Sequence, residues 1–155
     1  MRRRHFLAAG ALLPPLLSSG ARVVSAAPPP EPITPALVDA ASKEGKVPYY
    51  TARDLSVAEP MAKAFEARYP GIKVAVERTG AERLFNRLGQ EVSSNIRRCD
   101  VVNSSDAAHL IVWKRAGMLA SYLPEEVAAH FPKEHYDPDG MFASWRVSLC
   151  PIGYN

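Results

Sequence analysis

The chain has 155 residues, of which 47% are hydrophobic and 23% are charged, a balance that predicts one globular domain with its own core. Its formal net charge is +3, but four of the 19 basic residues lie in residues 1–26, which hold no acidic residue. The remaining 15 basic and 16 acidic residues give a net charge of −1, which excludes the strongly basic surface that nucleic-acid binding requires.

The N-terminus has the features of a secretory signal peptide over residues 1–26. Residues 2–7 form the basic region of such a peptide, residues 6–17 are apolar but too few to span a bilayer, and the small residues just before Ala27 form a cleavage site. We expect cleavage after Ala26 or Ala27 and a periplasmic mature protein. An uncleaved membrane anchor is the alternative.

Two adjacent arginines bear on the export route. Arg3 and Arg4, followed by Phe6 and Leu7, resemble the twin-arginine export signal, in which Ala8 stands where a lysine is usual. The sequence leaves open whether the protein uses the twin-arginine pathway or the general secretory pathway.

The mature chain begins with a proline-rich segment, residues 27–35, which predicts an extended lead-in. A short helix is expected over residues 37–41, ended by Gly45. Residues 46–50 predict the first strand, in which Pro48 is unusual because proline cannot donate a hydrogen bond to a neighbouring strand. Pro48 therefore indicates either a strand start or a position whose N–H is locally unpaired.

The middle of the chain repeats one pattern three times: an apolar strand, then small or hydroxyl residues, then a helix. The strands are predicted over residues 46–50, 72–76 and 101–102. Strands that alternate with helices in this way predict an α/β fold with an open, mostly parallel sheet flanked by helices.

Capping residues and apolar stripes predict the helices after the first two strands. The expected capping boxes are Ser56 with Glu59 and Thr79 with Glu82. The stripes, which are typical of the core-facing side of a helix, contain Val57, Met61, Ala64 and Phe65 in the first helix and Leu84, Leu88 and Val92 in the second.

The third strand is followed by Ser104 and Ser105, either of which suits the N-cap of the next helix, with Asp106 in its first turn. That helix is expected to end at Gly117. Beyond it, the sequence predicts a short helix starting at residues 123–126, a turn at residues 136–140 and a strand over residues 142–149.

Small and hydroxyl residues thus follow each predicted strand, at the edge of the sheet where open α/β folds bind ligands. Each group also begins a helix, whose free backbone N–H groups favour an anion, and Arg53 adds a guanidinium suited to a carboxylate or phosphate. We expect a small anionic or polyhydroxyl solute at this edge. The candidate ligand-binding residues are Thr51, Ala52, Arg53, Thr79, Gly80, Ser104, Ser105 and Asp106.

No arrangement of residues in the sequence predicts catalysis, a resident cofactor or a metal site. The sequence holds no nucleophile elbow and no pair of carboxylates at one corner, and His109 is expected on a helix, where it packs or faces solvent. Cys99 and Cys150 form no redox or zinc motif, and whether they pair as a disulfide or remain thiols stays open. Trp145 is expected to be a packing aromatic.

A series of short motifs runs through residues 44–51, 65–74, 100–108, 137–140 and 153–155. Their order resembles the N-terminal part of periplasmic solute-binding proteins of ABC transporters, in the branch that contains the ferric-iron binders. The resemblance implies two lobes joined by a hinge, a solute bound between them, an ABC permease as the membrane partner, and a monomer when complete. It places the hinge at Tyr154 and Asn155, so that residues 36–155 form the N-terminal lobe and the second lobe is absent.

The chain departs from the iron binders at the positions of their metal ligands. The resemblance places their first-loop histidine near Arg53 and Asp54 and their acidic ligand at Ser105, while their tyrosine pair lies in the absent lobe. Iron is therefore not expected as the solute. A periplasmic sensing or partner-binding domain is the alternative function, an exported α/β enzyme is a weaker one, and whether the chain is a truncated product or a functional short form stays open.

Overall fold

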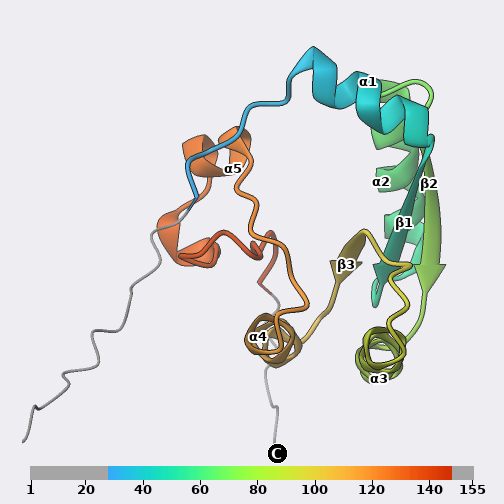
Figure 1. The fold of residues 1–155 in the computed structure, drawn as a ribbon, viewed down its shortest axis with the longest axis vertical. Coiled ribbons are helices and arrows are strands. Elements are labelled where there is room, and N and C mark those ends of the chain that lie inside the picture. The colour runs from blue at the N-terminus through green and yellow to red at the C-terminus, as the bar shows by residue number, and fades with distance from the viewer. Residues whose placement is uncertain (1–27, 148–155) are drawn as a thin grey trace, which may run out of the picture.

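The computed structural model describes residues 28–147, in which helices and strands alternate through the first two thirds (Figure 1). The elements are α1 Pro35–Glu44, β1 Lys46–Thr51, α2 Leu55–Arg68, β2 Lys73–Arg78, α3 Ala81–Ser93, β3 Val101–Asn103, α4 Ala107–Arg115, α5 Glu125–His130 and the 3₁₀ turn η1 Lys133–His135. None of these helices has both the length and the apolar character needed to cross a membrane. The predicted signal peptide, Cys150 and the predicted hinge at Tyr154 and Asn155 lie outside the described residues.

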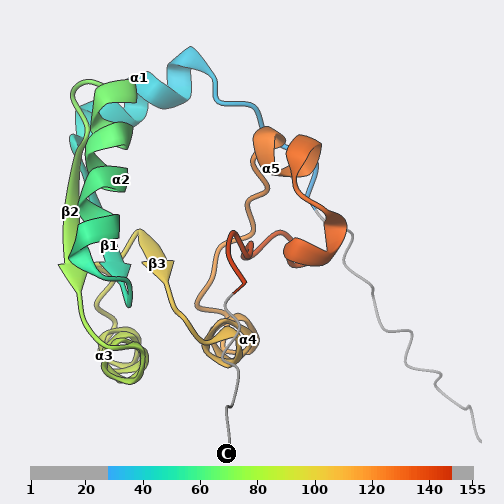
Figure 2. The same ribbon diagram turned by 180° about the vertical axis from the view of Figure 1, so that it is seen from behind.

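Three parallel strands form the sheet, in the order β2-β1-β3. β1 pairs with β2 along its whole length, from Lys46 opposite Lys73, but it pairs with β3 only from Tyr49 opposite Val101. Figures 1 and 2 show α2 alongside the sheet and α3 and α4 near the edge where the strands end. The predicted α/β fold with an open parallel sheet is confirmed.

α1 begins and ends at the residues that its sequence favours. The Thr34 hydroxyl accepts a hydrogen bond from the Leu37 N–H at 3.2 Å, and Gly45 ends the helix in the left-handed conformation at φ 71°, which glycine adopts without a Cβ clash. The Gly45 carbonyl then accepts from the Lys73 N–H at 2.9 Å. The end of α1 therefore joins the start of the β1–β2 pairing.

Pro48 lies inside the central strand, at a position where no neighbouring strand would accept a hydrogen bond from its nitrogen. Its carbonyl accepts from the Asp100 N–H at 3.2 Å, so Pro48 faces the β3 side of β1. In a parallel ladder the N–H and C=O of one residue face the same neighbour, and β3 pairing starts only at Tyr49. Pro48 therefore stands where the strand needs no N–H donor, as the sequence predicted.

The core lies between the sheet and the two helices that follow its second and third strands. The fully buried cluster comes from β1, α3 and α4 and consists of Tyr50, Leu84, Leu88 and Trp113. Leu84 and Leu88 are 0% and 7% exposed, and Val92 is half-buried. The predicted core-facing stripe of α3 is therefore confirmed.

The predicted core-facing stripe of α2 is wrong. Its members are exposed: Val57, Met61, Ala64 and Phe65. The buried residues of α2 are instead Ala58 and Ala62, and the helix packs against β2. Small side chains let a helix lie close to a sheet, whereas Val57, Met61 and Phe65 keep 39–41% of their surface exposed.

Both predicted capping boxes are also wrong. The N-cap of α2 is Asp54, which leaves Ser56 inside the first helical turn, and the N-cap of α3 is Gly80 rather than Thr79. The Thr79 N–H donates to the Thr51 carbonyl at 3.0 Å, so Thr79 still belongs to the strand ladder. The chain turns into α3 one residue later than its hydroxyl pattern predicts.

Asp106 is the N-cap of α4, in place of the predicted Ser104 or Ser105. Its Oδ1 accepts from the Ala108 N–H at 2.8 Å, and the helix begins at Ala107. The Ser104 hydroxyl accepts from the Asp106 N–H at 3.1 Å and so holds the capping residue itself. Asp106 therefore precedes the first turn, where its side chain satisfies a free N–H group directly.

Glu31, within the proline-rich lead-in, pairs with a later part of the chain. The Glu31 N–H donates to the Leu123 carbonyl at 2.9 Å, and the Glu125 N–H donates to the Glu31 carbonyl at 3.1 Å. These two bonds make an isolated parallel bridge between Glu31 and Pro124. The lead-in is thereby fixed next to the start of α5, as Figure 1 shows.

The predicted turn at residues 136–140 is confirmed, but the predicted strand that follows it is not present over residues 142–147. Gly140 has φ 69° and its N–H donates to the Asp137 carbonyl at 2.9 Å. After the turn, a single antiparallel bridge joins Tyr136 to Ala143. The residues before Tyr136 form η1, so they offer no extended partner with which a strand could continue.

Candidate functional site

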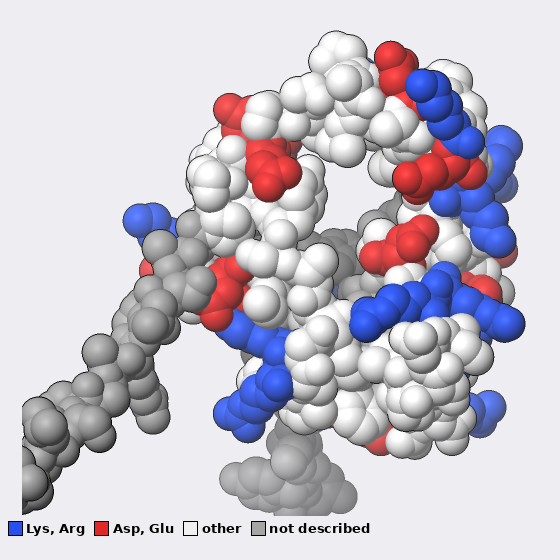
Figure 3. All heavy atoms as spheres, viewed as in Figure 1, with Lys and Arg blue, Asp and Glu red and all other residues white. Residues whose placement is uncertain are grey.

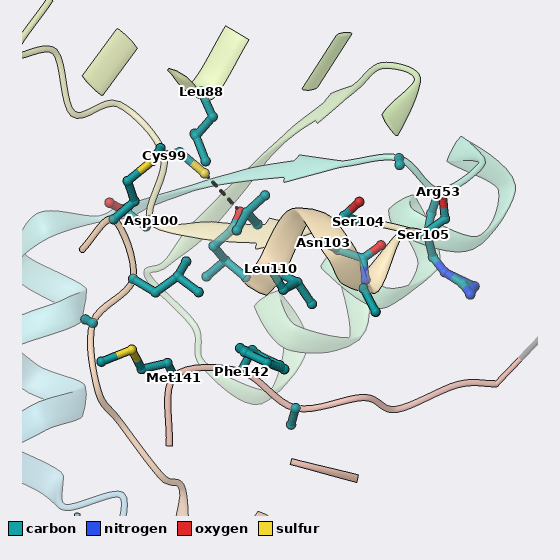
Figure 4. A pocket seen from close by; sticks show the side chains of 18 of the residues that line it. Arg53, Leu88, Cys99, Asp100, Asn103, Ser104, Ser105, Leu110, Met141 and Phe142 are labelled. Carbon is teal, nitrogen blue, oxygen red and sulfur yellow. Dashed lines mark hydrogen bonds between the residues drawn. The ribbon is translucent and has the colours of Figure 1, made fainter. Parts of the chain in front are cut away.

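A cavity of about 880 Å³ opens beside β3, on the side of the sheet away from β2. Its walls come from the β1–α2 loop, the loop between α3 and β3, the first turn of α4, and residues 118–122 and 141–146. Figure 4 shows Arg53 and Ser105 at one end of this cavity and Cys99 at the other.

Arg53 is positioned by a backbone hydrogen bond to Thr51, which Asn103 holds in turn, and by stacking on Trp145. Its backbone N–H donates to the Thr51 hydroxyl at 3.0 Å, and that hydroxyl donates to Asn103 Oδ1 at 3.3 Å. The Arg53 guanidinium carbon lies 4.3 Å from the centre of the Trp145 ring, a geometry that attracts a cation to the face of an indole. A guanidinium stacked by its face keeps its N–H groups free along its edge.

The Arg53 guanidinium has no carboxylate partner among the described residues. Two other arginines do, since Arg78 pairs with Asp54 at 3.3 Å and Arg87 pairs with acidic residues of β2 and α3. A half-buried guanidinium with open donors is a site for a carboxylate or phosphate oxygen.

The hydroxyls of Ser104 and Ser105 play different parts. The Ser104 oxygen lies 2.9 Å from His109 Nδ1 and accepts from the Asp106 N–H, so its hydrogen-bonding capacity is largely used within the fold. Ser105 is exposed at the cavity and makes no side-chain hydrogen bond within residues 28–147. Ser105 is therefore the hydroxyl that is free for a ligand.

The structure brings together only half of the predicted ligand-binding residues. The cavity is lined by Ala52, Arg53, Ser104 and Ser105. It is not lined by Thr51, Thr79, Gly80 or Asp106. Thr51 is fully buried and supports Arg53, while Thr79 and Gly80 follow β2, which the strand order places on the far side of β1 from β3.

Three arginines that sequence analysis did not select also line the cavity: Arg97, Arg98 and Arg146. With Arg53 they outnumber the acidic residues of the lining, which are Asp54, Glu91 and Asp100. Figure 3 shows basic side chains gathered next to α3 and a hollow at the centre of this face. The sequence signal for this basic lining was the adjacent pair Arg97 and Arg98, which comes shortly before β3.

Between its charged ends the cavity is apolar. Leu110 and Phe142 belong to its lining, together with Val102 and Met118, and Figure 4 shows Phe142 across from the β3–α4 segment. The combination of a cationic end and an apolar wall suits an organic molecule that carries an acidic group.

Cys99 is not poised as a nucleophile. Burial raises the pKa of its thiol to about 11, and the thiol lies 3.3 Å from the Val101 carbonyl, to which it donates. At neutral pH the group is therefore protonated, whereas a reactive cysteine is a thiolate.

A second group of side chains comes together outside the cavity. Glu82, Asp106 and His109 each place one potential metal-ligand atom within 4.8 Å of the others. Sequence analysis predicted no metal site and did not link these residues, because Glu82 lies on α3 and the other two lie at the start of α4. Within residues 28–147, they are the three side chains best placed to hold a cation.

Comparison with known proteins identifies the fold. No model of a protein family matches the sequence, and a search of curated proteins gives no match. Among solved structures, iron-bound HitA from Pseudomonas aeruginosa matches at 26% identity with a TM-score of 0.53, over 61% of this chain and 30% of its own. The ferric binding protein from Campylobacter jejuni matches at 26% identity with a TM-score of 0.54, over 61% and 29%. The chain has part of the periplasmic binding protein fold.

The extent of this match corresponds to one lobe of a ferric-binding periplasmic binding protein. Apo ferric ion-binding protein A from Pasteurella haemolytica, at 25% identity and a TM-score of 0.52, is covered over 29% of its length. The chain thus spans about 30% of the length of the solved structures that it matches.

Within this part of the periplasmic binding protein fold, the two positions that the sequence resemblance assigned to iron ligands lie on one cavity. Arg53 and Asp54 follow β1, Ser105 follows β3, and all three line the same space. Neither a guanidinium nor a serine hydroxyl is a usual iron ligand, and the Asp54 carboxylate is paired with Arg78 at 3.3 Å. The cavity therefore has the residues for an anion at the positions where the resemblance places metal ligands.

Proposed function

We propose that the chain is the solute-binding component of an ABC transporter, in the form of one lobe, and that its solute is a small organic anion. The observation that carries this proposal is Arg53, a half-buried guanidinium without an acidic partner in residues 28–147. It is stacked on Trp145 at the end of a cavity of about 880 Å³. The partial periplasmic binding protein fold supports the same function.

The surroundings of Arg53 favour an anion over an uncharged polyhydroxyl solute. The exposed Ser105 hydroxyl lies on the same cavity as the Arg53 guanidinium, and both groups can donate to a negatively charged oxygen. A sugar would use the hydroxyl of Ser105 and the amide of Asn103 but would leave the guanidinium unpaired. A carboxylate or phosphate would pair with the guanidinium and also accept from the Ser105 hydroxyl.

Ferric iron is a separate candidate because the similar solved structures are described as iron-bound or ferric-binding. We do not propose it for this chain, since Arg53 and Ser105 supply no iron ligand. Titration of the protein with ferric citrate is expected to give no visible charge-transfer band, because Arg53 and Ser105 offer the metal no ligand. A stoichiometric band would contradict the proposal.

We expect this chain alone to bind its solute weakly. A periplasmic binding protein encloses its solute between two lobes, and this chain spans about 30% of the solved structures that it matches. Loss of a few contacts of about 1–1.5 kcal/mol each moves a micromolar site, at about −8 kcal/mol, towards the millimolar range. The solute is therefore expected to bind with a dissociation constant of about 1 mM.

Calorimetry on the chain that starts at Ala27 tests the proposal, with citrate, inorganic phosphate and glucose as probes. We expect citrate to bind, glucose not to bind, and Arg53→Ala to abolish citrate binding. Arg68→Ala is the matched control, because Arg68 also lies over an aromatic ring, that of Tyr69 at 5.9 Å, but does not line the cavity. Glucose binding that survives Arg53→Ala would replace the anion by a polyhydroxyl solute.

The proposed function also requires export to the periplasm and an ABC permease as partner. Mass spectrometry of the periplasmic fraction is expected to show a mature N-terminus at Ala27 or Pro28. Loss of export when Arg3 and Arg4 are changed to lysine would assign the twin-arginine route, and unchanged export would assign the general pathway. A cytoplasmic protein that retains residues 1–26 would contradict the proposal.

A further inference from the structure

Beyond the solute cavity, the N-terminal ends of α3 and α4 bring three metal-ligating side chains together. His109 Nε2 lies 3.4 Å from Glu82 Oε1 and 3.9 Å from Asp106 Oδ2. These two carboxylates are exposed, whereas His109 is 6% exposed. The arrangement is therefore a buried imidazole that points out towards two accessible carboxylates.

The orientation of His109 is fixed from behind. Its Nδ1 lies 2.9 Å from the Ser104 hydroxyl, and its ring stacks on Phe85 with the ring centres 4.5 Å apart. A second partner on one ring nitrogen is what holds a metal-binding histidine in place and leaves the other nitrogen for the ion. Nε2 makes no hydrogen bond within residues 28–147, so it is the atom left for a ligand.

The carboxylates are also arranged with one oxygen each towards Nε2. Asp106 uses Oδ1 to cap α4 and turns Oδ2 towards His109. Glu82 contacts no other side chain of the described residues within salt-bridge distance. Favourable interaction with the helix N-termini explains why acidic residues occur here, but it does not explain why both face the same imidazole nitrogen.

The 3.4 Å from His109 Nε2 to Glu82 Oε1 fits two ligands of one ion, whereas the 3.9 Å to Asp106 Oδ2 would have to shorten by a few tenths of an ångström when an ion binds. A charge-assisted N–H···O bond is about 2.7–2.9 Å long, shorter than the 3.4 Å from His109 Nε2 to Glu82 Oε1. Two ligands of a tetrahedral zinc ion, at about 2.0–2.2 Å from the metal, are about 3.3–3.5 Å apart. One imidazole and two carboxylates, with a water molecule as the fourth ligand, form a donor set that zinc accepts.

We propose that Glu82, Asp106 and His109 bind a divalent transition-metal ion of the zinc type at the junction of α3 and α4. The ion joins the first turns of the helices that follow β2 and β3. It neutralises the two carboxylates and occupies the position in front of His109 Nε2. This site lies outside the cavity lining and does not depend on the proposed solute.

Calorimetry with zinc chloride on the chain that starts at Ala27 tests the proposal, with the fold of each variant checked by circular dichroism. We expect one zinc ion per chain with a micromolar dissociation constant, at least tenfold weaker binding in Glu82→Gln and in Asp106→Asn, and no binding in His109→Ala. The two amide variants keep the size of the side chain, and Asn still serves as an N-cap. They therefore test the site even if His109→Ala disturbs the core.

Glu126→Gln is the matched control, because Glu126 Oε2 lies 3.6 Å from His130 Nε2 on the exposed surface of α5. This variant is expected to bind zinc as the unchanged chain does. Absence of saturable zinc binding would overturn the proposal. Zinc affinity in Glu82→Gln and Asp106→Asn that is unchanged from the parent chain would also overturn it. A thiolate-to-metal absorption band with cobalt would do the same, because it would place the ion at a cysteine.

Discussion

The guanidinium of Arg53 is stacked on the indole ring of Trp145, 4.3 Å from the ring centre, although 92 positions separate the two residues in the sequence. Trp145 belongs to the segment that closes the cavity opposite β3. The contact therefore joins the first strand's loop to the far wall and sets the direction in which the guanidinium presents its N–H groups.

We expect Trp145→Ala to weaken citrate binding without abolishing it. A cation–π contact at an exposed site contributes about 0.5–1 kcal/mol, which corresponds to about a two- to fivefold change in the dissociation constant. Tyr69→Ala, which removes the ring beside Arg68, is the control and should leave binding unchanged. Calorimetry measures both, and unchanged binding in Trp145→Ala would show that the stacking does not prepare Arg53 for a ligand.

Leu84→Ala is expected to be strongly destabilising. Leu84 is 0% exposed and packs with Tyr50 and Trp113, and removing a buried leucine side chain costs about 2–5 kcal/mol of unfolding free energy. Ile111→Ala, at a position that is 43% exposed on α4, should cost less than about 0.5 kcal/mol. Urea unfolding measures both variants, and similar losses would mean that the core is not centred on α3 and β1.

Stability is expected to fall as the pH rises from about 9 to 11, the range between the ordinary and the raised pKa of Cys99. Burial raises the pKa of Cys99 to about 11, burial also raises the pKa of Tyr50, and hydrogen bonds to Asp137 and Asp139 raise the pKa of Lys114. In this range the folded chain binds more protons than the unfolded chain, so each step to higher pH favours unfolding.

Urea unfolding at pH 8 and pH 10.5 checks this expectation, with Cys99→Ala as the comparison. The variant removes one of the three groups, so its unfolding free energy should fall less between the two pH values. A fall of equal size in the variant would show that the Cys99 thiol does not contribute to the alkaline loss of stability.

The sequence predicted the fold class because its strand-and-helix repeat has a direct physical cause. β-branched strands and the leucine stripe of α3 need burial, and only parallel strands with crossover helices provide it in this order. The helix starts were displaced because a hydrogen bond from a distant strand decides where a strand ends, as Thr79 bonded to Thr51 shows. A capping pattern read along the chain does not contain that information.

The α2 stripe was predicted wrongly for a related reason. Val57, Met61 and Phe65 have the spacing of a buried face, yet the sheet is covered by the face that contains Ala58 and Ala62. Periodicity identifies an apolar side of a helix, but the room left above the sheet decides which side faces it. In the part of the chain that the structure describes, Val57, Met61 and Phe65 therefore stay exposed.

The site was predicted in part. Residues that follow β1 and β3 line one cavity, as expected for adjacent parallel strands, whereas Thr79 and Gly80 are separated from it because β2 occupies the other side of β1. The group of Glu82, Asp106 and His109 could not be predicted, since it depends on the distance between α3 and α4. Its three members are unremarkable in the linear sequence.

Backbone amide NMR during a citrate titration tests the central claim most directly, because it reports where a weakly bound anion lies. The claim predicts saturable shifts that are largest at Ala52, Arg53 and Ser105, and that are lost in Arg53→Ala but kept in Arg68→Ala. Shifts that spread over the exposed basic residues in proportion to salt concentration, or that persist in Arg53→Ala, would contradict an anion site at this cavity.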